Sequence, residues 1–329
     1  MALGSFGRVG RDLMIPVIDL HCDTLWRVFT YGGCFSSNDY HIDLQKLKAG
    51  GSAAQFFAAF IYMNERRRPV EDYRKDTYAM IERFNREIEE NPGLAAASSR
   101  DDFERNKRNG MVSAFLTIEE GGIIESSQDL ASLYDKNVRL ITLTWNYPNS
   151  LGYPNIDWTY SGKGLTSLGR DIVSEMAHKG ILVDVSHLSD AGFWDTADIL
   201  QGPFLASHSC CRTLTHHPRN LTDKMIKAIA DHHGVVGVNF SASFLGTGEK
   251  GTIEGIIAHM KHLKKTGGMD ICALGSDFDG IFCPLEVKDY SGMPLLLTAL
   301  KENGFTEEEC EKIAFKNALR MIDYMGKEV

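Results

Sequence analysis

Six histidine and acidic side chains stand directly after short apolar runs in this chain of 329 residues. They are His21, Asp23, Glu119, His187, His208 and Asp277. Imidazole and carboxylate groups are ligands that suit zinc, with manganese and cobalt as alternatives. Three of each are enough for two ions, and a carboxylate that bridges two ions is typical of sites that activate water. The pattern therefore predicts a metal site with hydrolytic chemistry.

Each of these residues also has a plainer explanation. A histidine at a strand end is commonly a hydrogen-bonded structural residue, and an aspartate there commonly caps the next helix. Glu120, beside Glu119, carries the same charge and is an equal candidate by type. These explanations would have to hold at five strand ends at once, and this favours the metal site. Within the first strand, residues i and i+2 point to one side, so His21 and Asp23 can face the same ion.

The apolar runs are typical of buried parallel strands, and amphipathic stretches lie between them. Strands are expected at Val17–His21, Ala53–Tyr62, Val112–Ile118, Arg139–Thr144, Ile181–His187, Phe204–Ser207, Val235–Phe240 and Ile271–Gly275. Helices are expected at Tyr73–Glu90, Leu165–His178, Ala191–Leu200, Asp223–His232 and Ile253–Lys265, with starts at Ser189-Asp190 and Thr222-Asp223. Eight strands in this alternation predict a single-domain (β/α)8 TIM barrel. The alternative is an open doubly wound sheet, but the sequence has no Gly-x-Gly-x-x-Gly after its first strand and no Walker loop.

Composition limits the partners and the location. The net charge of −9 argues against nucleic acid and against an anionic membrane surface. No apolar run approaches the roughly 18 to 20 residues that span a bilayer. Seven cysteines without disulfide-framework spacing predict free thiols and a cytoplasmic protein. Residues 1–13 lack the apolar core of a signal peptide, and we expect them to be an extension outside the fold, with residues 14–329 forming the barrel domain.

Several short motifs follow one another along the chain. They are His21-Cys-Asp23-Thr, Glu119-Glu-Gly, Asp184-Val-Ser-His187, Ser207-His208-Ser, Pro218-Arg219-Asn220 and Gly275-Ser-Asp277-Phe-Asp-Gly280. In this order they resemble the renal (membrane) dipeptidase family of the metal-dependent amidohydrolase superfamily. The resemblance extends from about residue 15 to Arg320.

The resemblance implies a (β/α)8 barrel that holds two zinc ions. The implied ligands are His21 and Asp23 for one ion, His187 and His208 for the other, and Glu119 as the bridge. Asp277 and Asp279 have the i, i+2 spacing of a strand, so both could face the site. The family's acid/base carboxylate matches Asp277, and Asp279 would orient a ligand from behind. The resemblance also makes a homodimer an expectation.

Two residues of the Pro218-Arg219-Asn220 motif are expected to bind substrate. Arg219 matches the family residue that binds the free carboxylate of a dipeptide. The role suits its chemistry, because a guanidinium holds a carboxylate through two hydrogen bonds. Asn220, its neighbour, is the second expected substrate contact.

One position departs from the family pattern. After the fourth strand the family generally has Leu-Thr-His, and that histidine helps to polarise the scissile carbonyl, whereas this chain has Leu143-Thr144-Trp145. An indole offers one donor and carries no positive charge, and losing such a donor costs about 2.7–4 kcal/mol of transition-state stabilisation. Either Trp145, Asn146 or another group takes over this role, or the substrate differs from the family's usual dipeptides.

These observations predict a cytoplasmic, zinc-dependent dipeptidase that hydrolyses short peptides through a metal-bridging hydroxide and tolerates a C-terminal D-residue. Two alternatives stay open. The first keeps the metal site but acts on an N-acyl amino acid, a lactone or another small amide, because fold does not fix function. The second is a metal-binding protein without turnover. Asp277 argues against the second, because a pure binding site needs no base.

Overall fold

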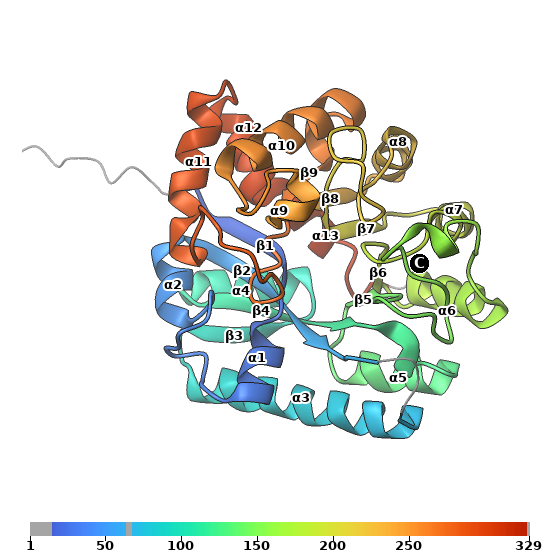
Figure 1. Ribbon diagram of the computed structural model, residues 1–329. Coiled ribbons are helices and arrows are strands. Elements are labelled where there is room, and N and C mark those ends of the chain that lie inside the picture. Colours follow the sequence, from blue (N-terminus) through green and yellow to red (C-terminus); the bar gives the residue numbers. More distant parts are fainter. Residues whose placement is uncertain (1–14, 64–67, 328–329) are drawn as a thin grey trace, which may run out of the picture.

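The computed structural model describes residues 15–63 and 68–327, and within them eight parallel strands close into a barrel (Figure 1). The strands follow one another around the barrel in the order β1, β2, β4, β5, β6, β7, β8 and β9, and β9 pairs with β1. Helices surround the strands, so the predicted TIM barrel is confirmed. The expected extension at residues 1–13 lies outside the described residues.

The predicted strands all have counterparts in the structure. The described strands are β1 Val17–Cys22, β2 Ser52–Phe60, β3 Leu94–Ala97, β4 Val112–Glu119, β5 Leu140–Thr142, β6 Leu182–Asp184, β7 Leu205–Ser209, β8 Val235–Val238 and β9 Cys272–Leu274. Only β3 was not expected, and it pairs in parallel with the first half of β4 outside the closed ring.

The helices follow the alternation that the sequence predicts. The described α-helices are α1 Thr24–Tyr31, α2 Leu44–Ala49, α3 Val70–Glu90, α4 Arg100–Arg108, α5 Ser127–Asp135, α6 Ser167–His178, α7 Asp190–Ile199, α8 Asp223–Asp231, α9 Ala242–Leu245, α10 Ile253–Gly267, α11 Met293–Glu302, α12 Glu307–Glu311 and α13 Asn317–Ile322. The two predicted helix starts are confirmed, because the Ser189 hydroxyl accepts from the Gly192 N–H and the Thr222 hydroxyl accepts from the Met225 N–H. Such caps satisfy N–H groups that the first helical turn leaves unpaired.

The barrel interior changes from apolar to polar along the strands. An apolar cluster that includes Leu140, Leu182 and Leu205 lies toward the strands' amino ends, where it packs with residues of α13. Two residues further along the same strands stand Thr142, Asp184 and Ser207, all buried. Because side chains two apart share a face, the same strands that build the core also deliver polar groups to the carboxyl end.

Two sequence-based expectations about the rest of the molecule can be compared with this structure. The seven cysteines, all in described segments, are free thiols. Among the described helices, none has the length and apolar character needed to cross a membrane.

Candidate metal centre and pocket

The carboxylate of Glu119 lies between histidines from three different strand ends. Its Oε1 atom is 3.1 Å from His187 Nε2 and 3.7 Å from His208 Nε2. Its Oε2 atom is 3.4 Å from His21 Nε2 on the other side. One carboxylate thus turns each oxygen toward a different set of imidazoles, which is the arrangement of a bridging ligand.

A buried hydrogen-bond chain fixes the tautomer of His208. Asp184 accepts from the hydroxyl groups of Thr142, Ser186 and Ser207, each at 2.6 Å. Because the Ser207 hydroxyl donates its hydrogen to Asp184, its oxygen must accept from His208 Nδ1, which is 2.7 Å away. The lone pair of His208 is therefore on Nε2 and points at the Glu119 carboxylate.

His187 is held in the matching tautomer. Its Nδ1 lies 3.1 Å from the carbonyl oxygen of the Asn146 side chain, which can only accept. Its Nε2 atom therefore carries a lone pair, and it lies 3.0 Å from the Nε2 atom of His208. Burial holds the pKa of both imidazoles well below 6.5. Two nitrogen lone pairs and a carboxylate oxygen thus converge, and neither of these imidazole nitrogens carries a hydrogen of its own, so these residues fit a metal cation.

The other side of the cluster, around His21 and Asp23, also has buried polar atoms that could bind a cation. His21 Nε2 is buried without a hydrogen-bond partner, and so is the Oδ1 atom of Asp23. Ligand atoms of His21, Asp23 and Asp277 lie within 4.8 Å of one another, as do those of His21, Glu119 and His208. A Cβ on Gly280 would lie 2.2 Å from Asp23 Oδ2 and 2.4 Å from Asp277 Oδ1. Glycine therefore allows this loop to close over the carboxylates.

The buried carboxyl groups hold protons more tightly than they would in water. Burial, reinforced by the neighbouring charge of Glu119, raises the pKa of Asp23 to about 6. Burial, reinforced by Asp23 and Glu119, raises the pKa of Asp277 to about 8 against the opposing effect of His21. Burial lowers the pKa of His21, but its contacts with Glu119 and Asp23 outweigh this and raise that pKa well above 6.5. Crowded acidic groups of this kind take up either protons or a cation.

Asp277 and Asp279 do not share the strand-like relation that their spacing suggested. Both have positive φ angles, 59° and 72°, in the turn after β9. Asp277 turns toward the metal cluster, and its Oδ2 atom accepts from Asn239 Nδ2 at 2.8 Å. Asp279 instead accepts from the Thr24 hydroxyl and from the His41 N–H, so it fixes the start of α1 and the loop before α2.

Glu120, which matched Glu119 by residue type, lies in a different environment. Its left-handed backbone, with φ at 96°, directs the side chain to the loop that follows β5. There its Oε2 atom accepts from the Trp145 backbone N–H at 3.1 Å, and its Oε1 atom accepts from Gly122 and Asn149. Burial raises the pKa of this carboxyl group to about 7. Glu119 is thus the cluster residue, and Glu120 fixes the position of Trp145.

The two expected substrate residues of the Pro218-Arg219-Asn220 motif differ in their placement. Arg219 is buried in the pocket wall, where its Nη2 donates to His187 Nε2 at 2.9 Å and its Nη1 donates to the Ser186 carbonyl. Burial lowers its pKa to about 10, still far above neutrality. Asn220 does not line the pocket, and its side-chain amide donates to the carbonyls of Thr215 and Phe244.

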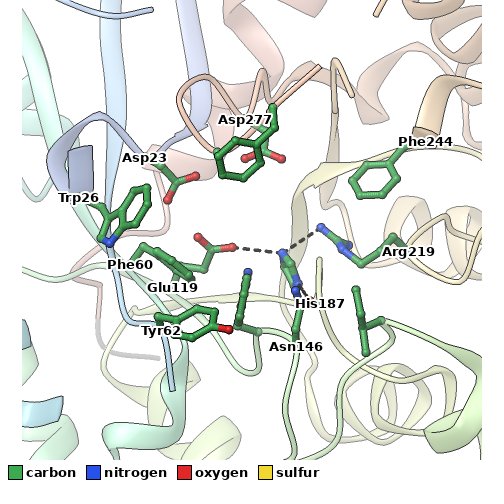
Figure 2. A pocket seen from close by; sticks show the side chains of 14 residues that line it. Asp23, Trp26, Phe60, Tyr62, Glu119, Asn146, His187, Arg219, Phe244 and Asp277 are labelled. Carbon is green, nitrogen blue, oxygen red and sulfur yellow. Dashed lines mark hydrogen bonds and ion pairs between the residues drawn. The ribbon is translucent and has the colours of Figure 1, made fainter. Parts of the chain in front are cut away.

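One cavity of about 380 Å³ is lined by four residues of the cluster, Asp23, Glu119, His187 and Asp277, and by Arg219. Figure 2 shows Arg219 and Phe244 on one side, Trp26, Phe60 and Tyr62 on the other, and Glu119 and His187 between them. Trp145 and Asn146 also line the cavity. A volume of this size suits a small molecule, and its polar groups gather at the centre and at the arginine end.

Several of these residues escaped the sequence analysis. The Asp184 carboxylate appeared only as a letter of a motif, although its place at the end of β6 could have marked it as a buried polar group. Ser207 likewise appeared only inside a motif, and Thr142 gave no signal, because both are common residue types whose partner comes from another strand. Apart from Trp145, the aromatic residues that line the cavity gave none either, since aromatic residues near strand ends are usually part of the core.

A TIM barrel with a buried histidine and carboxylate cluster at its strand ends is the architecture of a metal-dependent hydrolase. The sequence model of the membrane dipeptidase family, peptidase family M19, matches residues 11–327. A relative from Klebsiella pneumoniae, an uncharacterised protein encoded in the 5′ region of pqqA, is 37% identical over 240 residues, which are 70% of this chain and 88% of the relative.

Solved structures agree with this match. A metallopeptidase of the M19 family described as dipeptidase AC has a TM-score of 0.87 and 27% identity, over 95% of this chain and 99% of its own. A metallopeptidase from Rhodobacter sphaeroides, solved with a phosphinate mimic of the dipeptide L-Ala-D-Ala, has a TM-score of 0.87 and 26% identity over the same shares. The chain belongs to the membrane dipeptidase family of metallopeptidases.

Proposed function

We propose that this protein is a zinc-dependent dipeptidase that accepts a D-residue at the C-terminal position. The observation that carries the proposal is that a cluster of histidines and carboxylates suited to a metal cation and the buried guanidinium of Arg219 lie at one small cavity. The metal cluster can bind the peptide bond that is cleaved. The guanidinium of Arg219 can bind the terminal carboxylate, which lies one residue away in the same dipeptide. The Rhodobacter sphaeroides relative, solved with a mimic of L-Ala-D-Ala, supports the extension to D-residues.

The residues that would hold zinc come from four strand ends. They are His21, Asp23, Glu119, His187 and His208, with Glu119 shared between two ions. When bound there, zinc supplies an acidified water and polarises the carbonyl oxygen of a peptide bond.

Two further side chains supply the rest of the chemistry. Arg219 has five N–H donors, of which one bonds the Ser186 carbonyl and one bonds the His187 Nε2 lone pair that zinc would take. The remaining N–H groups, and the one that zinc would release from His187, are available for the substrate's terminal carboxylate. Asp277 keeps its Oδ2 atom on Asn239, so its Oδ1 atom is the one that accepts a proton from the attacking water. The same atom then returns the proton to the leaving amine.

The first test is hydrolysis of paired L,L and L,D dipeptides by the zinc-loaded full chain, beside a sample treated with a chelator. We expect cleavage that disappears with the metal and returns when zinc is added. Absence of cleavage by protein that demonstrably holds zinc contradicts the proposal and favours an N-acyl amino acid, a lactone or another small amide.

A second test addresses Arg219. Arg219→Ala should raise KM for a dipeptide with a free carboxylate by about a hundredfold, because a charge-assisted hydrogen-bonded pair is lost. The same variant should change little for the corresponding dipeptide amide, whose terminus carries no charge. Equal losses on both substrates would instead indicate that Arg219 acts through His187.

A further inference from the structure

The cavity ends opposite Arg219 in a set of aromatic side chains, which we call the aromatic wall. It consists of Trp26, Phe60, Tyr62 and Trp145. Phe60 meets Trp26 edge to face at 5.5 Å between ring centroids and meets Trp145 edge to face at 4.9 Å. Tyr62 meets Trp145 in the same manner at 5.2 Å. The rings therefore form one continuous surface.

The wall belongs to three different parts of the chain, and each is anchored. Trp26 lies in α1, Phe60 ends β2, and Tyr62 follows two residues later. Trp145 is fixed through its backbone N–H, which donates to the buried Glu120 carboxylate. A surface built this way is formed before substrate arrives, so ordering it costs little upon binding.

The wall is large but incompletely covered. Phe60 is only 7% exposed, whereas Tyr62 is 50% exposed and Phe282, which also lines the cavity, is 83% exposed. Covering such accessible apolar surface with an apolar ligand side chain is favourable and therefore strengthens binding.

The charges near the wall limit what kind of side chain fits. The guanidinium of Arg27 lies 5.2 Å from the ring centroid of Trp26 and 5.2 Å from that of Phe282. A lysine or arginine side chain on the substrate would meet this like charge. The carboxylates that line the cavity are Asp23, Glu119 and Asp277. They belong to the metal cluster, so they do not offer a partner for a positively charged substrate side chain at the wall.

We propose that the aromatic wall selects a large apolar side chain, aliphatic or aromatic, on the residue that precedes the scissile bond. The inference rests on the proposed function, because Arg219 holding the terminal carboxylate decides which end of the dipeptide faces the wall. With Glu119 and His187 between the two ends, the first residue's side chain is directed to Trp26, Phe60 and Tyr62 (Figure 2). Trp145 thus contributes to specificity at the position where the family generally has a histidine.

The test measures kcat/KM of the zinc-loaded full chain for X-Ala dipeptides, with X as Ala, Leu, Phe, Lys or Glu, and for the reversed Ala-X series. We expect Leu-Ala and Phe-Ala to exceed Ala-Ala by about tenfold or more, with Lys-Ala below them. The reversed series should vary much less. A preference that appears only in the reversed series, or that favours Lys or Glu, overturns the proposal.

Variants then tie the preference to the wall. Tyr62→Ala, at a half-exposed position, should reduce the Phe-Ala to Ala-Ala ratio by about fivefold or more, and Trp145→Ala should do the same. Trp194→Ala removes an aromatic ring of similar exposure on α7 and should leave the ratio unchanged. Unchanged ratios in both wall variants would overturn the assignment.

The preference for apolar side chains and the dipeptidase activity itself are contradicted by different results. Cleavage of Ala-Ala and Phe-Ala at equal rates contradicts the role of the wall but leaves a dipeptidase. No cleavage of any dipeptide by protein that holds zinc contradicts the dipeptidase itself, and the specificity inference with it.

Discussion

Asp277 carries two carboxyl oxygens with different surroundings. The Oδ2 atom accepts from Asn239, whereas the Oδ1 atom lies 3.8 Å from His21 Nε2 at the edge of the metal cluster. Burial raises the pKa of this group to about 8, and a cation nearby would lower it again. Asp277 is thus a carboxyl group whose proton affinity can be matched to proton transfer near neutrality.

Asp277→Asn should therefore reduce kcat by about 10²–10⁴-fold, because the amide cannot take up the proton. Zinc content per chain should stay at the wild-type value, since five other side chains remain in the cluster. Metal analysis and steady-state kinetics on one preparation give both numbers. Wild-type turnover in the variant would exclude the acid/base role, and loss of zinc would make Asp277 a ligand instead.

Ser207 links the Asp184 carboxylate to His208 and gives a second prediction at this scale. Ser207→Ala removes the acceptor for His208 Nδ1, so the imidazole is no longer held in one tautomer. Loss of such a supporting contact typically weakens metal binding by about 10–100-fold. Competition against a zinc-binding dye measures the change.

Ser209→Ala is the matched control for this experiment. Ser209 lies two residues further on the same strand, and its buried hydroxyl has no hydrogen-bond partner. The Ser209→Ala variant should therefore bind zinc with the wild-type affinity. Equal affinities for both variants would show that the hydroxyl of Ser207 does not position His208.

The six strand-end residues were predictable because residue type and position agree at each of them. The direction of a side chain was not predictable where a residue was selected only because it lies close in the sequence to a stronger candidate. Asn220 was selected beside Arg219, but its amide is used on loop carbonyls. Asp279 was placed by strand geometry that the positive φ angles of the turn do not allow. The roles of the cluster residues, of Arg219 and of Trp145 stay predictions until the experiments above are done.

At the scale of elements, strands with long apolar runs were predicted well. The missing element, β3, is four residues long with the sequence Leu-Ala-Ala-Ala, which suits a helix as readily as a strand. Its pairing with β4 depends on a neighbour that is distant in the sequence. Helix α1 starts at Thr24, directly after the expected ligand Asp23, so a short element that serves the site was also missed.

Helix α10 contacts the end of β7 through His259, and this gives a prediction about pH. The Nδ1 atom of His259 accepts from the Cys211 backbone N–H at 3.0 Å, while Nε2 lies 3.3 Å from the Leu245 carbonyl. Burial lowers the pKa of His259 to about 4. In the unfolded chain the same imidazole takes up a proton near pH 6.5.

Between about pH 6.5 and pH 4 the unfolded chain therefore binds more protons at this residue than the folded chain does. Stability should fall as the pH falls through this range, by up to about 3 kcal/mol from His259 alone. His259→Gln keeps an acceptor for Cys211 but does not titrate, so its stability should decline less. Urea unfolding of chelator-treated protein at about pH 7 and about pH 5 measures the difference.

The exposed His216 provides the control for this prediction. His216→Gln should follow the wild-type pH dependence, because His216 is exposed and takes no part in the contact between α10 and the end of β7. If His259→Gln also follows the wild type, the contact between α10 and the end of β7 does not depend on the protonation of this histidine.

For the whole molecule, closure of the barrel brings together residues as distant in the chain as His21 and Asp277. The apolar runs predict that closure, because only a ring of strands places all their carboxyl ends around one centre. The distances within the cluster do not follow from the sequence. They depend on details such as the register shift between β7 and β8 from Ala206 to Ser209, where Ser207 and His208 turn to the same site.

The cluster joins five strand ends, so a bound ion should stabilise the entire barrel. A ligand present at about 100 times its Kd stabilises the folded state by about 2.7 kcal/mol. Zinc added to chelator-treated protein should therefore raise Tm by several degrees.

This gain in Tm should depend on pH. Asp23 and Asp277, with pKa values raised by burial to about 6 and about 8, must release protons to make room for the cation, so the gain should be larger near pH 8 than near pH 6. Glu119→Gln, which removes the charge shared by both halves of the cluster, should lose most of this gain, and magnesium should not replace zinc because it prefers oxygen ligands and resists dehydration. Equal Tm values with and without zinc would mean that these side chains are held together by the fold alone.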